Sequence, residues 1–183
     1  MSIALGEPFP LDEFLDWERG QELRYEFDGV QPVAMTGGTV AHSVIASNVA
    51  RALEDRLQTP CRAFRGDLKV LAANRVRYPD VVVTCAPVPD ESDVLPEPLV
   101  VFEVLSASTA VIDRTVRAEE FKTIASLRRY IMLEQSRAEA VVLTRSAAAW
   151  TDERLAGLAA VLRLSELGIE VPLAEFYRGV GAG

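Results

Sequence analysis

Two apolar stretches of the sequence each contain a single carboxylate. The segment VRYPDVVVTC, residues 76–85, places Asp80 between a proline and three consecutive valines. The segment LVVFEVLSAST, residues 99–109, places Glu103 inside a second apolar run. A charged group is costly to bury unless it is paired, hydrogen-bonded or bound to a metal. The chain must therefore fold so that both carboxylates receive such a partner.

Strand periodicity predicts where these carboxylates point. Alternate side chains share a face, so Asp80 should lie with Val82, and Glu103 with Val101. If the two strands are neighbours, one register brings both carboxylates side by side. A divalent cation would then remove their repulsion, since Mg²⁺ prefers oxygen ligands and takes one or two carboxylates plus water and phosphate. The alternative from spacing alone is a strand-end Asp and a Glu paired with Arg or Lys.

Composition sets the broad class of protein. The 183 residues are 49% hydrophobic and 25% charged, which is typical of one globular domain spanning residues 1–183. No apolar run is long enough to span a membrane, and the start lacks a signal sequence, so we expect a cytoplasmic protein without membrane association. Cys61 and Cys85 are too few for a disulfide framework and lack metal-site spacing. We expect Cys85 to be a small core residue.

The charge is acidic overall but unevenly distributed. A net charge of −8 argues against a protein that coats nucleic acid. Residues 61–79, however, hold five basic residues against the single Asp67, and residues 114–129 hold five against Glu119 and Glu120. These stretches flank the two carboxylate segments, although solvated faces without function would look the same.

The order of predicted elements indicates an α+β fold with a mixed central sheet. A hairpin is predicted around Asp28-Gly29, which is a strong turn signal. Helices are predicted at residues 10–18, 41–58 and 111–127, strands near 67–71, 76–85, 99–105, 129–134 and 138–145, and an alternating tail that ends in a short turn or helix.

Several motifs occur together in a family-specific order. RYEFDG, AHSVIASNVARAL, GDLKV, RYPDVVV, EVLSAST, SLRRYIMLEQ and LAEFY resemble the bacterial Uma-two family of restriction-endonuclease-like proteins, within the PD-(D/E)XK phosphodiesterase superfamily. The resemblance covers nearly the whole chain. It implies a restriction-endonuclease-like αβββαβ core with an added N-terminal helix and hairpin. It also implies a metal-dependent endonuclease that hydrolyses DNA phosphodiester bonds with Mg²⁺ or Mn²⁺.

The resemblance further implies a set of site residues. Asp80 and Glu103 would bind the metal, with the Val104 carbonyl as a further candidate ligand. Glu26, in the RYEFDG motif, is a third acidic candidate for the catalytic site. Its alternative role is to pair with a nearby arginine.

The chain departs from the superfamily pattern at one important position. The last motif residue is usually a lysine that stabilises transition-state charge, but here it is Leu105. A cation from elsewhere must substitute. Lys69, which we expect on a strand beside that of Asp80, is our first choice, with Lys122 and Arg117 as alternatives. Arginine keeps the charge but cannot act as a base. His42, the single histidine, is predicted to cap or support its helix or to contact phosphate.

Two expectations about partners and activity follow. An acidic chain of this size would grip DNA better as a homodimer, so we expect one. The rival function is a catalytically silent nuclease fold that serves as a binding or regulatory module. The missing motif lysine and Arg117 favour this rival, whereas retention of both carboxylates disfavours it.

Overall fold

The computed structural model describes residues 9–35, 37–106, 113–147 and 149–181. Its elements, in chain order, are α1 (Leu11–Glu18), β1 (Tyr25–Phe27), β2 (Pro32–Ala34), α2 (Val40–Glu54), β3 (Arg62–Arg65), β4 (Val70–Ala72), β5 (Arg75–Arg77), β6 (Val81–Thr84), β7 (Pro98–Leu105), the π-helix η1 (Asp113–Arg117), α4 (Ala118–Lys122), β8 (Arg129–Glu134), β9 (Glu139–Arg145), β10 (Trp150–Ala156), β11 (Val161–Leu164), β12 (Ile169–Pro172) and α5 (Leu173–Phe176).

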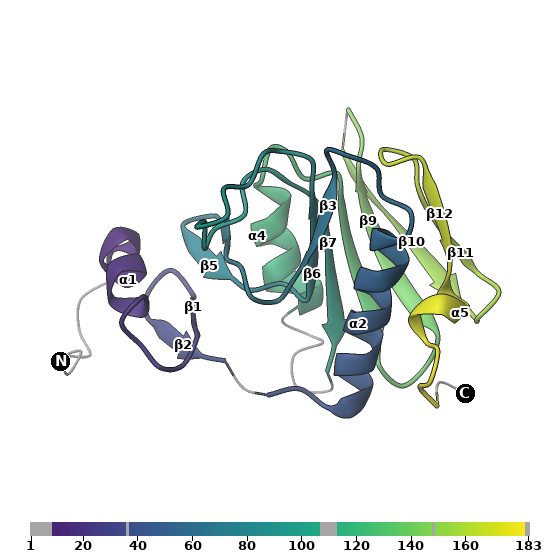
Figure 1. Ribbon diagram of the computed structural model, residues 1–183, viewed down its shortest axis with the longest axis horizontal. Coiled ribbons are helices and arrows are strands. Elements are labelled where there is room, and N and C mark those ends of the chain that lie inside the picture. The colour runs from purple at the N-terminus through teal and green to yellow at the C-terminus, as the bar shows by residue number, and fades with distance from the viewer. Residues whose placement is uncertain (1–8, 36, 107–112, 148, 182–183) are drawn as a thin grey trace.

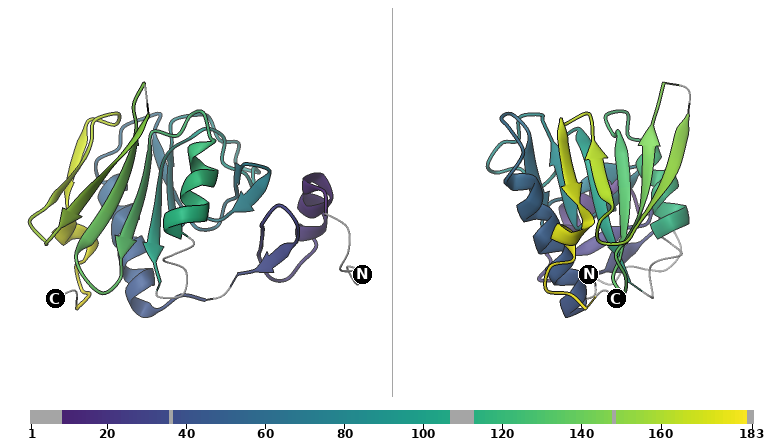
Figure 2. Two further views of the ribbon diagram at one scale, coloured as in Figure 1. Left: turned by 180° about the vertical axis from the view of Figure 1, so that it is seen from behind. Right: turned by 90° about the vertical axis from the view of Figure 1, so that its right-hand side faces the viewer.

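A six-stranded sheet forms the centre of the molecule, in the order β10-β9-β8-β7-β6-β3. Strands β7 and β8 run parallel, while the other neighbours in this sheet run antiparallel. Helix α2 covers one face of the sheet and α4 lies on the opposite face (Figures 1 and 2). The predicted α+β class and mixed central sheet are therefore confirmed.

The N-terminal helix and hairpin form a separate layer at one end of the molecule (Figure 1). Strands β2 and β1 join β5 and β4 in a four-stranded sheet. Helix α1 closes this layer by stacking Phe14 on Phe27, with ring centroids 5.0 Å apart. Both rings are fully buried, and they share a cluster with Val76 of β5 and Tyr78, so this cluster anchors the N-terminal addition to the fold.

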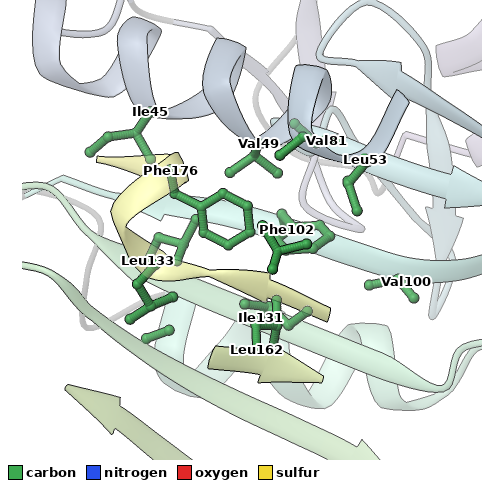
Figure 3. Packing of buried hydrophobic residues seen from close by; sticks show 14 of the residues in the cluster. Ile45, Val49, Leu53, Val81, Val100, Phe102, Ile131, Leu133, Leu162 and Phe176 are labelled. Carbon is green, nitrogen blue, oxygen red and sulfur yellow. The ribbon is translucent and has the colours of Figure 1, made fainter. Parts of the chain in front are cut away.

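The larger core lies between α2 and the central sheet. Ile45, Val49 and Leu53 recur every four residues, so they form one stripe on α2. This stripe packs on Phe102 and Ile131 of the sheet (Figure 3). In the described ranges, no helix combines the length and apolar character that crossing a membrane requires.

The predicted strand over residues 76–85 is wrong, because the chain forms two strands there. Strand β5 ends at Arg77 and belongs to the four-stranded sheet, whereas β6 begins at Val81 in the central sheet. Pro79 separates them, since proline fixes φ and lacks the N–H that a ladder needs. Asp80 consequently lies just before a strand.

The expectation that Cys85 is a small core residue is also wrong, because Cys85 is only half-buried. Cys61 and Cys85 form a disulfide bond. Strand β3 pairs with β6 so that Arg62 faces Thr84, and continuing this antiparallel register by one residue places Cys61 opposite Cys85. Sequence spacing could not reveal this pairing, because it depends on which strands become neighbours.

Candidate functional site

The two carboxylates singled out by the sequence lie on neighbouring segments of the central sheet. Strand β6 pairs antiparallel with β7, with Val81 opposite Phe102, and continuing that register by one residue brings Asp80 opposite Glu103. The N–H of Val104 donates a 2.7 Å hydrogen bond to Oδ2 of Asp80. The Asp80 carboxylate therefore contacts the backbone of the residue that follows Glu103.

Asp80 is also held through its other carboxylate oxygen, by a residue of helix α2. Nε2 of His42 lies 3.1 Å from Oδ1 of Asp80. Helix α2 begins beside this contact because Oγ1 of Thr39 accepts the N–H of His42 and caps the helix. A Cβ at Gly38 would lie only 3.1 Å from Nδ1 of His42, so glycine leaves room for the imidazole. Thr39 therefore supplies the cap of the helix, whereas His42 contacts Asp80, and the role of His42 stays a prediction.

Glu103 is buried and contacts an arginine. Nη1 of Arg117, at the end of η1, lies 3.2 Å from Oε1 of Glu103. Nη2 of the same arginine lies 2.7 Å from Oε2 of Glu26. The guanidinium of Arg117 thus bridges Glu103 and Glu26, which are two of the acidic site residues predicted from the sequence. Pairing of Glu103 with an arginine, the alternative from spacing alone, is present in the structure.

These contacts extend into a buried charge network, which comprises Glu103, Arg117, Glu26, Arg77 and Glu120. Arg77 lies 3.3 Å from Glu26 and makes two hydrogen bonds, of 2.7 and 2.9 Å, to Glu120 on α4. The acidic members and Arg77 are each at most 7% exposed. Charges this deeply buried need partners of opposite charge. In this network acidic and basic side chains alternate, so each charge has such a partner.

Lys69, our first choice for the missing lysine, lies in a different cluster. Its ammonium is 2.9 Å from Oε2 of Glu18 and 2.8 Å from Oδ2 of Asp93. The expectation that Lys69 lies on a strand beside that of Asp80 is wrong, because β4 pairs with β5, whereas β6 lies between β7 and β3. The Lys69 hydrogen bond lowers the pKa of Asp93. Lys69 thus connects α1 to the loop before β7.

The neighbouring tyrosine belongs to the same cluster. The hydroxyl of Tyr78 donates a 2.8 Å hydrogen bond to Oε1 of Glu18. Burial, followed by this hydrogen bond, raises the pKa of Tyr78 far above its ordinary value. Tyr78 therefore stays neutral and acts as a hydrogen-bond donor that helps to satisfy the buried Glu18.

The three candidate cations differ in the carboxylates that they contact. Lys122 pairs with Glu119 of its own helix at 2.6 Å, in an exposed position. Lys69 contacts Glu18 and Asp93, as described above. Arg117 is the candidate that contacts Glu103. The sequence signal for it was its position just beyond the EVLSAST motif, on the helix that follows the second carboxylate.

An open pocket of about 370 Å³ adjoins Asp80. We call it the α2 pocket, because α2 supplies one wall and the end of β3 with the following turn supplies the other. It is lined by Gly38, His42, Ser43, Ala46, Ser47, Arg65, Gly66, Asp67 and Asp80. The pocket gives solvent and small ligands access to one of the two carboxylates.

The donor set can be tested for its fit to a metal ion. Within the described ranges, no group of three or more His, Cys, Asp or Glu side chains is arranged to hold one. Zinc sites need such a set, whereas Mg²⁺ keeps several waters and takes one or two carboxylates. Asp80 lines the open pocket and lies opposite Glu103, and two carboxylates are the kind of donors that a partly hydrated divalent cation takes. They do not fit a closed zinc site.

The sheet order and the flanking helices define an α+β protein with a mixed central sheet. The model of the Uma2 family, described as "Putative restriction endonuclease", matches residues 11–174. The chain belongs to this family, and the resemblance carried by its motifs is confirmed.

Two similar proteins extend this comparison. The "Uncharacterized protein slr1290" of Synechocystis sp. (strain ATCC 27184 / PCC 6803 / Kazusa) is 33% identical over 139 residues, which cover 72% of this chain and 73% of that protein. A crystal structure of a "putative nuclease belonging to DUF820" from Anabaena variabilis ATCC 29413 superposes with a TM-score of 0.73 at 17% identity. The match covers 93% of this chain and 98% of that one, and it supports the fold.

Proposed function

We propose that this protein is an endonuclease that hydrolyses DNA phosphodiester bonds and requires Mg²⁺ or Mn²⁺. The observation that carries the proposal is the 2.7 Å hydrogen bond from the N–H of Val104 to Asp80. It fixes one carboxylate against the strand segment that bears the other. The family description supports the nuclease class.

Asp80 and Glu103 would hold the ion, with the Val104 carbonyl as a further ligand. Such an ion, when bound, polarises a phosphoryl oxygen and lowers the pKa of a coordinated water. The protein's own contribution is to fix the donors in advance. His42 and the Val104 N–H hold the Asp80 carboxylate from two sides, so little reorganisation is needed on binding.

Arg117 would take the electrostatic role of the missing lysine. A guanidinium stays charged and matches two phosphate oxygens at once, so it can stabilise charge that develops on a phosphoryl group. It cannot accept the proton of the attacking water. Glu26 keeps a 2.7 Å contact to Nη2 of Arg117, and this leaves the guanidinium positioned while Nη1 turns to a substrate oxygen.

The experiment is a DNA cleavage assay on plasmid and short duplex substrates with Mg²⁺, Mn²⁺ or chelator. We expect metal-dependent cleavage by the wild type and a loss on the order of a hundredfold or more in Asp80→Asn and Glu103→Gln. Asp152→Asn is the matched control, because Asp152 is an exposed carboxylate on β10. Cleavage by Asp80→Asn at the wild-type rate would contradict the proposal.

A second candidate function is a catalytically silent nuclease fold that binds a partner. Two observations favour it: Leu105 occupies the motif lysine position, and Glu103 is already paired with Arg117. A comparison of DNA binding with DNA cleavage distinguishes the two candidate functions. A silent module binds DNA without cutting duplex or single strands in either metal, whereas an endonuclease cuts.

We also propose that the protein works on DNA as a homodimer. The net charge of −8 disfavours tight binding by one copy, and two copies would double the number of phosphate contacts. Light scattering coupled to size exclusion, with and without DNA, checks this. A monomer in both conditions would contradict it.

A further inference from the structure

The α2 pocket contains three polar side chains that the candidate site does not use. Ser43 and Ser47 lie four residues apart on α2, so their side chains share one face of the helix. Arg65 is the last residue of β3, which is an edge strand of the central sheet. All three line the pocket that also contains Asp80.

Arg65 is a cation without a counter-charge in the part of the chain that the structure describes. Its side chain is exposed and makes no ion pair or side-chain hydrogen bond there. The carboxylate of Asp67, in the same pocket, is instead paired with Arg24 at 2.7 Å. The positive charge of Arg65 is thus available to a ligand, and the nearest acidic side chain on its own loop is already neutralised.

The two serines add uncharged donors to the same pocket. Within the described ranges, neither hydroxyl has a hydrogen-bond partner, although serines inside helices often bond to a carbonyl one turn earlier. A hydroxyl can rotate its O–H toward an acceptor. Two free hydroxyls and one free guanidinium around a common pocket are the groups that bind phosphate oxygens in protein–DNA contacts.

The pocket is large enough for more than a single anion. A volume of about 370 Å³ lies within the range of small-molecule pockets, which is about 300 to 1,000 Å³. That volume accommodates a phosphate together with the adjoining sugar. The pocket is open to solvent, so a bound strand can continue beyond it.

We propose that the α2 pocket binds a backbone phosphate of the DNA strand, adjacent to the phosphate cleaved at Asp80, through Arg65, Ser43 and Ser47. This inference rests on the proposed endonuclease function, because it takes DNA as the ligand. It assigns the pocket to positioning of the strand without base readout. Arg65 therefore contributes equally to binding of all DNA sequences.

The test is a DNA-binding measurement that does not depend on cleavage. Asp80→Asn serves as the parent variant, because it removes both the repulsion of phosphate by Asp80 and a proposed catalytic ligand. Fluorescence anisotropy of a labelled DNA duplex, with chelator present, gives the binding constant over a series of salt concentrations. Arg65→Ala is then compared with the parent, and its melting temperature verifies that it is folded.

We expect Arg65→Ala to weaken binding on the order of tenfold, with the same factor for unrelated DNA sequences. The slope of log K against log salt should fall in magnitude by about 0.9, which is the value for one phosphate contact on duplex DNA. The double variant Ser43→Ala/Ser47→Ala should weaken binding severalfold without altering the slope, since hydroxyls carry no charge. Arg154→Ala, the same charge change on the opposite edge strand β10, should leave both quantities unchanged.

The inference is overturned if Arg65→Ala keeps the parent's affinity and slope, or if Arg154→Ala reduces them equally. It is also overturned if the parent does not bind DNA at all. Failure of the endonuclease proposal looks different: Asp80→Asn would then cleave like the wild type, or the wild type would bind without cleaving. Binding in chelator separates the two outcomes.

Discussion

Arg117 and Glu103 form a 3.2 Å ion pair. Nucleases of this superfamily usually carry a lysine two residues beyond the second carboxylate. In this chain that position holds Leu105, which packs in the core beneath α4. The positive charge therefore comes from the helix that follows β7 instead of from β7 itself. A second contact, from Arg117 to Glu26, ties this cation to the N-terminal hairpin.

Removal of Arg117 should destabilise the metal-free protein. Arg117→Met leaves Glu103 and Glu26 without their shared cation in a buried site, so the free energy of unfolding should fall by about 3–5 kcal/mol. Arg117→Lys should cost less, because it keeps the charge and loses only the forked geometry. Arg163→Met, which breaks an exposed pair with Glu170, should cost at most about 1 kcal/mol. Urea denaturation measures all three, and equal losses in Arg117→Met and Arg163→Met would contradict the buried network.

Gly38 offers a test of His42 with a built-in control. An alanine Cβ at Gly38 would lie 3.1 Å from Nδ1 of His42, whereas at Gly37 nothing lies within 4 Å. Gly38→Ala should therefore move the imidazole away from Asp80 and lower kcat by ten- to a hundredfold, on the order expected for a misplaced catalytic group. Gly37→Ala should retain wild-type cleavage. DNA cleavage kinetics compare the two variants. The same kcat in both would show that the position of His42 does not affect cleavage.

Lys69 should prove structural. Lys69→Met leaves the buried carboxylate of Glu18 without its cationic partner, so the free energy of unfolding should drop by about 3–5 kcal/mol. Cleavage per folded molecule, measured well below the melting temperature, should stay near the wild-type value, because the ammonium contacts Glu18 and Asp93. Loss of cleavage in a fully folded Lys69→Met protein would contradict this prediction and would indicate a catalytic role for Lys69.

The Asp93–Lys69 contact predicts a small dependence of stability on pH. The hydrogen bond from Lys69 lowers the pKa of Asp93 below its ordinary 3.8. A depressed carboxyl pKa stabilises the fold above the unfolded value, and this gain is lost as the pH falls through the folded value. Because the Asp93 side chain is 45% exposed, the gain should be below about 1 kcal/mol. Asp93→Asn should thus be slightly less stable than wild type near neutral pH and equal to it well below pH 3.8, as urea denaturation can verify.

Much of the fold could be predicted from periodicity. The stripe of Ile45, Val49 and Leu53 predicted α2, and the apolar run around Glu103 predicted β7. Strand β10 was missed, because the segment Trp150–Ala156 is mostly polar and exposed at the sheet edge. Its identity as a strand comes from pairing with β9, which is tertiary information that local pattern does not contain.

The site was harder to predict than the fold. Asp80 and Glu103 could be found because buried carboxylates conflict with their apolar surroundings. Lys69 could not be placed, since Pro79 divides the predicted strand and sends β4 and β5 to the other sheet. Arg117 could be named only as one of three candidate cations, and Arg65 carries no local signal, because their contacts depend on which loops and strands meet in space.

Calorimetric titration of Mn²⁺ tests most directly whether Asp80 and Glu103 share one divalent cation. We predict one saturable binding event in the wild type, weakened at least tenfold in both Asp80→Asn and Glu103→Gln, and unchanged in Asp152→Asn. Absence of saturable binding to the wild type, or equal binding by Asp80→Asn, would contradict a shared cation.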